Sequence, residues 1–167
     1  MPTLRRLLGP GLAVLLTTAA FTAAAATKAD YESLAKHAAQ FGEYSKELGE
    51  LAEQVTNPPP DHELALYLSQ EAKVFFIEAL LLSDHLLMYM LTDAGETRTQ
   101  IRKIVGGRLR DVDSQIESAL KVTNDYVFKT KNPALAKPAR GLAKALKEYR
   151  ETVKRIAKEL GTKDAKW

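Results

Sequence analysis

Hydrophobic residues recur at steps of three and four positions in four segments of this chain, which places them on one face of a helix in each segment. The segments cover about residues 28–55, 61–91, 96–129 and 134–160. Stretches rich in proline, glycine, asparagine or aspartate separate them, at residues 57–60, 92–95 and 132–133. No strand-like alternation of useful length is present in the sequence. The pattern therefore predicts an all-α fold.

Each segment has an apolar stripe that we expect to form a shared core. The stripe of the first segment is Tyr31, Leu34, Ala38, Phe41, Leu48, Leu51 and Val55. That of the second is Leu64, Leu68, Ala72, Phe75, Ala79, Leu82, Leu86 and Met90. That of the third is Ile101, Ile104, Val105, Leu109, Val112, Ile116, Leu120 and Val127. That of the fourth is Leu135, Ala139, Leu142, Leu146, Tyr149, Val153, Ile156 and Leu160. Four amphipathic helices with short connections predict an antiparallel four-helix bundle with coiled-coil-like packing.

The first 26 residues have the order of a secretory signal peptide. Arg5 and Arg6 precede an apolar run over residues 7–21, and alanines follow at positions 23–26. We expect cleavage after Ala25 or Ala26, with a retained anchor and twin-arginine export as the alternatives. The mature chain would then consist of the bundle, residues 27–161, and a frayed tail, residues 162–167. It would work in the periplasm or outside the cell.

The composition limits the chemistry of the protein. It contains no cysteine, which excludes disulfides, thiolate metal sites and a lipoprotein anchor. Residues 27–93 carry four lysines against twelve acidic residues, whereas residues 94–167 carry eighteen basic against nine acidic residues. This asymmetry indicates either acidic helices packed beside basic ones or a basic surface for an anionic partner. Export argues against a nucleic acid as that partner.

Two helix faces are candidate binding surfaces. The second segment has an additional apolar strip opposite its core stripe, formed by Val74, Ile77, Leu81 and Met88. If no neighbouring helix covers this strip, it would be a protein interface; three ionisable groups in residues 74–91 disfavour a transmembrane span there. The basic face of the fourth segment would meet either solvent or an anionic envelope surface. It consists of Lys137, Arg140, Lys144, Lys147, Lys154, Arg155 and Lys158.

Catalytic and metal-binding patterns are not recognisable. No Glu-x-x-His pair suits a di-iron site, the fourth segment has no His or Met for a haem, and no serine stands on a glycine-flanked elbow. Glu78, His85 and Met88 could contact a soft metal, although polar residues at this spacing are typical of a solvent-facing helix stripe. For His37 and His62 we expect solvent exposure or a capping role. No cofactor is expected.

The sequence thus favours an exported, non-enzymatic bundle that binds protein or has a structural role in the cell envelope. Self-association through the second segment is one form of this hypothesis. The alternative is a periplasmic bundle that binds a metal or a small ligand.

Overall fold

The computed structural model describes the backbone of residues 10–55 and 59–161 and the side chains of residues 28–55, 60–127 and 130–161. Within these ranges the protein is all-helical, without strands. The four helices are α1 (Pro10–Gln54), α2 (Pro59–Leu91), α3 (Glu96–Lys129) and α4 (Pro133–Glu159). They confirm the predicted all-α fold. Residues 1–9, where the predicted signal peptide begins, and residues 162–167, the predicted tail, lie outside the described residues.

The helix ends follow from local chemistry. The Asn132 side chain accepts a hydrogen bond from the backbone N–H of Ala134 at 3.0 Å, and Pro133, which has no N–H to satisfy, is the first residue of α4. Gly161 follows the last residues of α4 with φ 62°, the left-handed conformation that ends many helices. At the other end of the chain, α1 begins at Pro10 instead of near Lys28, so it runs without a break through the expected cleavage site.

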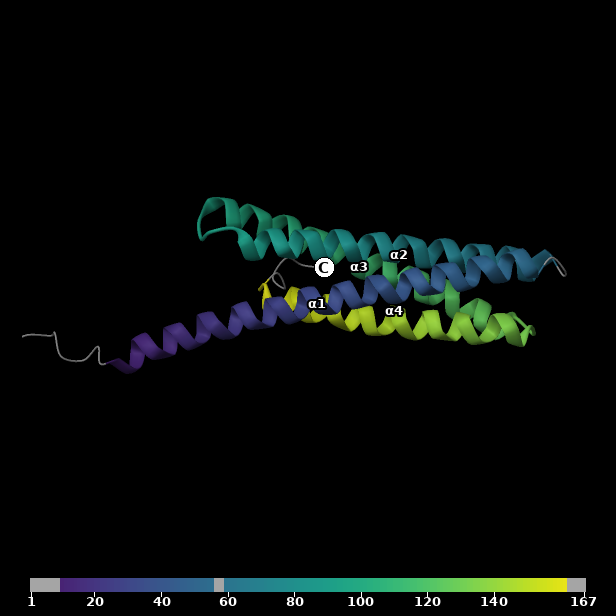
Figure 1. Ribbon diagram of the computed structural model, residues 1–167, viewed down its shortest axis with the longest axis horizontal. Helices are drawn as coiled ribbons and strands as arrows, with labels where there is room; N and C mark the ends of the chain where they lie inside the picture. Colours follow the sequence, from purple (N-terminus) through teal and green to yellow (C-terminus); the bar gives the residue numbers. More distant parts are fainter. Residues whose placement is uncertain (1–9, 56–58, 162–167) are drawn as a thin grey trace, which may run out of the picture.

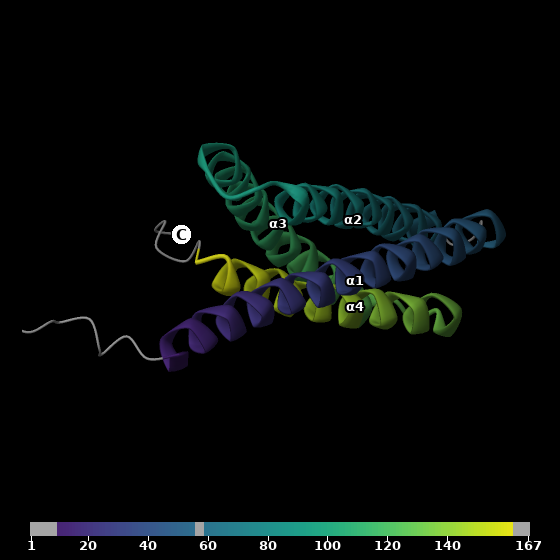
Figure 2. The same ribbon diagram turned by 60° about the vertical axis from the view of Figure 1, so that its left-hand side comes forward.

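The four helices are arranged along one long axis, as expected of a helical bundle (Figure 1). Helix α1 packs mainly against α2 and α4, and α3 packs against α4 and α2. Figure 2 shows that α3 is inclined across the other helices, and the first turns of α1 project beyond them.

The core is built from the predicted stripes. Every member of the fourth stripe is buried, and so is every member of the second except the half-buried Met90. At its centre Phe41, Phe75 and Tyr149 pack with ring centroids 5.4 to 6.4 Å apart, the spacing that edge-to-face and tilted aromatic pairs prefer. In the third stripe Ile101 and Val127 are half-buried, and Ile104 is 57% exposed near the start of α3.

His37 is buried, and the expectation of an exposed or capping residue is wrong for it. Its Nε2 lies 3.0 Å from Thr152 Oγ1, and that hydroxyl donates its own hydrogen to the Glu148 carbonyl. His37 Nε2 is therefore the donor, and the ring packs against Tyr149 and Phe41. Burial lowers the pKa of His37, which keeps it neutral at pH 7. His62 does have a capping role, with Nδ1 2.7 Å from the Ala52 carbonyl near the end of α1.

Two ion pairs join the acidic half of the chain to the basic half. Asp30 in α1 contacts Arg155 in α4, and Glu78 in α2 contacts Arg108 in α3. The most extensive helix contact nevertheless joins the two acidic helices, α1 and α2. The two ion pairs therefore compensate only part of the charge asymmetry.

The Asp30–Arg155 pair predicts a pH dependence of stability. Burial, reinforced by the neighbouring Glu159, raises the pKa of Asp30 from 3.8 to about 7 despite the opposing effect of Arg155. Because the native state keeps the proton that the unfolded state loses, the contribution of Asp30 to stability is complete below pH 3.8 and is lost as the pH rises towards 7. An Asp30→Asn variant cannot ionise at this position, so its stability relative to wild type should increase from about pH 4 to about pH 8. Urea denaturation of both proteins across this range measures the difference, and a constant difference would contradict the prediction.

Candidate functional site

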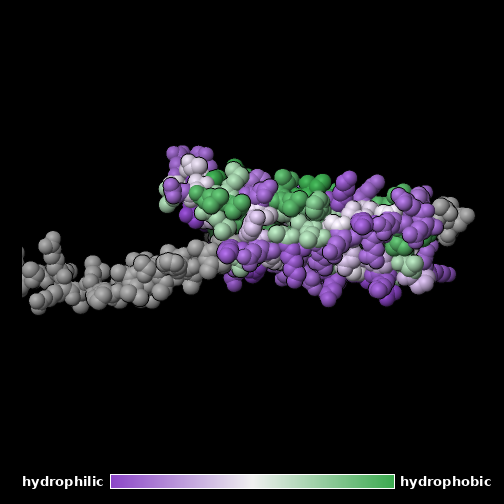
Figure 3. Space-filling view, in the orientation of Figure 1, coloured by the Kyte–Doolittle hydropathy of each residue, from purple (hydrophilic) through white to green (hydrophobic). Residues whose placement is uncertain are grey.

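Large apolar side chains are exposed along one side of α2. The four predicted strip residues all lie there: Val74 is 47%, Ile77 45%, Leu81 39% and Met88 53% exposed. Leu66, Leu80 and Leu91 are exposed on the same side. We call these seven residues the α2 apolar face. Figure 3 shows hydrophobic side chains gathered on the part of the molecule where α2 lies, above a mostly hydrophilic surface.

The packing of α2 against its neighbours explains why this face is exposed to solvent. The side of α2 that carries Phe75, Ala79 and Leu82 is buried in the core. Helix α1 contacts one flank of α2 at Ser69, and α3 contacts the other flank at Glu78. Ile77 is two residues from both Phe75 and Ala79, about 200° around the helix, and therefore points away from the core. The four strip residues keep 39 to 53% of their surface exposed, so the described part of the chain does not bury the strip.

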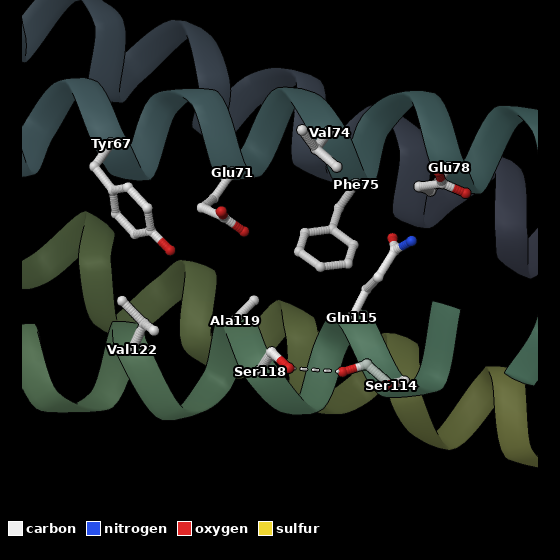
Figure 4. Close-up of a pocket in the computed structure, with 10 residues that line it drawn as sticks. All are labelled: Tyr67, Glu71, Val74, Phe75, Glu78, Ser114, Gln115, Ser118, Ala119 and Val122. Carbon is white, nitrogen blue, oxygen red and sulfur yellow. Dashed lines mark hydrogen bonds between the residues drawn. The ribbon is translucent and has the colours of Figure 1, made fainter. Parts of the chain in front are cut away.

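A cavity of about 420 Å³ lies beside the α2 apolar face, between α2 and α3. Val74 belongs to both features (Figure 4). Tyr67 and Glu71 of α2 face Ala119 and Val122 of α3 across the cavity, and Phe75 projects into the space between the helices. Burial and the carboxylate of Glu71 raise the pKa of Tyr67 to about 12, so its hydroxyl remains a hydrogen-bond donor at neutral pH. The lining of the cavity is mixed, because it also includes the polar residues Glu78, Ser114, Gln115 and Ser118.

The candidate metal ligands do not come together as a site. Both oxygens of Glu78 lie within 2.9 Å of Arg108 Nη2, so its charge is already compensated. His85 is half-buried, with an Nδ1 that has no hydrogen-bond partner among the described residues, and Met88 faces outward. The described part of the chain contains no group of three His, Asp or Glu residues placed to hold a metal ion.

The predicted basic face of α4 is exposed but is partly paired within the protein. Lys137, Arg140, Lys147, Lys154 and Lys158 are exposed to solvent. Lys144 lies 3.8 Å from Glu148, a surface pair of little energetic weight. Arg155 contacts the buried Asp30, which makes it part of the α1–α4 contact. The positive electrostatic potential of this face is therefore weaker than its seven basic residues suggest.

The sequence interpretation missed Leu66, Leu80 and Leu91 as members of the exposed face. The sequence pattern did indicate them, because each lies three to fourteen residues from Ile77 at helical spacing.

By length and composition alone, residues 60–91 of α2 could also cross a membrane, a test that core helices of water-soluble proteins pass as well.

Comparison with known proteins gives no family for this chain. No protein-family model matches it, and neither a curated protein nor a solved structure is significantly similar to it.

Proposed function

We propose that this protein is an exported, non-enzymatic antiparallel four-helix bundle that binds another protein through the α2 apolar face. The exposure of seven large apolar side chains along one helix carries this proposal. Monomeric soluble proteins rarely leave so many large apolar side chains together on one helix face, and faces of this kind usually mark interfaces. Burial of such area provides the main driving force for protein association.

The cavity beside the face supports the same function. Interfaces bind most tightly where a large side chain of one partner enters a pocket of the other, surrounded by contacts that exclude water. The cavity between α2 and α3 is large enough for such a side chain, and Val74 connects it to the exposed face. A partner that covers the face would therefore also reach a pocket.

Export is supported by the N-terminal leader, with its Arg5–Arg6 pair, apolar run and alanine tail. The connections of a few residues between successive helices support the antiparallel arrangement. A bundle without cysteine needs no oxidative folding and depends on helix packing alone. We place its role in the cell envelope, as a binding or structural component.

The proposal predicts that Leu81→Lys abolishes association and preserves the fold. Leu81 is exposed, so the change should alter the free energy of unfolding by no more than about 0.5 kcal/mol. A charge at this position would have to be desolvated in any interface that covers it, so complexes with proteins of the envelope fraction should be lost. Thermal denaturation measures the first effect, and light scattering together with co-purification measures the second.

Ile104→Lys provides the matched control. Ile104 is an exposed apolar residue of α3 that lies outside the α2 apolar face, so the same chemical change there should leave the complexes intact. If Leu81→Lys retains every complex that the wild type forms, the α2 apolar face is not a binding surface and the proposed function is wrong.

A further inference from the structure

Exposed residues on one side of α2 are regularly spaced along the helix, and the series includes polar as well as apolar residues. Its residues alternate at steps of four and three, the repeat of a coiled-coil seam. We call these eight positions the α2 seam: Leu66, Gln70, Lys73, Ile77, Leu80, Asp84, Leu87 and Leu91. All of them are exposed except Leu87, which is half-buried. At 1.5 Å per residue the seam is about 38 Å long, enough for one helix to pack along another.

When two α2 helices are placed antiparallel, the α2 seam of one is complementary to the α2 seam of the other. Around a point between Glu78 and Ala79, Ile77 is the mirror position of Leu80, and Leu66 is the mirror position of Leu91. The two charges of the seam, Lys73 and Asp84, are likewise equidistant from this point and have opposite signs. Neither charge has an ion-pair partner within the described chain.

We propose that the occupant of the α2 apolar face is a second copy of this chain, with the two α2 helices packed antiparallel about a twofold axis between Glu78 and Ala79. In this register Lys73 meets the partner's Asp84, and the symmetry forms the same ion pair a second time. Ile77 packs against the partner's Leu80, and Leu66 packs against the partner's Leu91. This inference rests on the proposed function and specifies its partner.

The charges select this arrangement over the other ways of pairing the seam. In a parallel dimer Lys73 would face the partner's Lys73 and Asp84 the partner's Asp84, and both contacts are repulsive. An antiparallel register shifted by one heptad places Lys73 opposite an apolar residue, which leaves its charge without a counter-charge. A surface adapted to an unrelated protein has no reason to be complementary to itself, whereas a twofold homodimer interface requires it.

Charge reversal in the full chain tests the proposal. Sedimentation equilibrium of the purified wild type should show reversible dimers. Lys73→Glu creates two Glu–Asp contacts and Asp84→Lys creates two Lys–Lys contacts, so each single variant should dimerise at least about tenfold more weakly. The double variant Lys73→Glu/Asp84→Lys exchanges the charges and should recover dimerisation to within about threefold of wild type. An equimolar mixture of the two single variants should form heterodimers, because every contact is again between opposite charges.

Lys121→Glu is the matched control, since it makes the same charge change at an exposed position of α3 and should not affect dimerisation.

Single variants that dimerise like the wild type would overturn the antiparallel register. A wild type that is monomeric up to its solubility limit would overturn self-association itself. In that second case, loss of envelope complexes in Leu81→Lys would still support the proposed function, so the two failures can be distinguished. Binding of the monomer to phospholipid vesicles in place of a second copy would also count against this inference.

Discussion

Phe41→Ala is expected to destabilise the protein by about 3–5 kcal/mol, a large part of the stability of a domain of this size. Phe41 is fully buried and packs against Phe75 and Tyr149, so its removal leaves a cavity where three helices meet. The surrounding rings come from α2 and α4 and cannot all move inward together. Urea denaturation followed by circular dichroism should show a much lower midpoint with an unchanged dependence on urea concentration.

Met88→Ala is the comparison for this experiment. Met88 is also large and apolar but lies on the α2 apolar face, so its truncation should change the free energy of unfolding of the monomer by about 0.5 kcal/mol or less. Comparable losses in both variants would mean that Phe41 is not part of a packed core.

Glu78→Leu is expected to lower the free energy of unfolding by about 2 kcal/mol. The side chain of Glu78 is 13% exposed, and its carboxylate compensates the charge of Arg108, whose side chain is 31% exposed. Loss of the carboxylate leaves the Arg108 cation in a half-buried position without its counter-charge. The loss is smaller than for a fully buried pair because part of the guanidinium can reach water.

The double variant Glu78→Leu/Arg108→Leu removes both charges and should recover most of the lost stability. Chemical denaturation of the wild type, both single variants and the double variant forms a double-mutant cycle. Additive losses in this cycle would show that the two residues are not coupled.

The helices and most of the core could be predicted from the sequence because both depend on local spacing. The stripe from Leu135 to Leu160 is buried throughout, since three- and four-residue steps place its members on one side of α4 whatever that side packs against. Ile104 was assigned to the third stripe but is exposed, because it lies about 100° around α3 from the fully buried Val105, at the margin of the stripe. Periodicity identifies a face but does not say how wide a part of the helix its neighbours cover.

The interior polar contacts could not be predicted, because their partners are distant in the sequence. His37 lies three residues after Leu34 and four before Phe41, so its position on the core face was visible, but its partner Thr152 is 115 positions away. Arg155 could be assigned to a basic face of α4 but not to Asp30, for the same reason.

The candidate interface was predicted in part. Val74, Ile77, Leu81 and Met88 were recognised as a second apolar strip, but their exposure depends on which sides of α2 its neighbours occupy. The sequence left that question open. The spacing of the α2 seam indicates an interface only together with the solvent exposure of the same side of α2, which the structure shows.

The unbroken course of α1 through residues 25 and 26 has a consequence for Asp30. In the uncut chain Asp30 is in the interior of a long helix, whereas removal of the leader would make it one of the first residues of α1. The peptide dipoles of a helix sum to a partial positive charge at its beginning, which stabilises a carboxylate there. Thr27 and Asp30 also have the spacing of a capping box, with Asp in place of Glu. If the proposed leader is removed, the pKa of Asp30 should therefore fall and its attraction to Arg155 should increase, which would tighten the contact between α1 and α4.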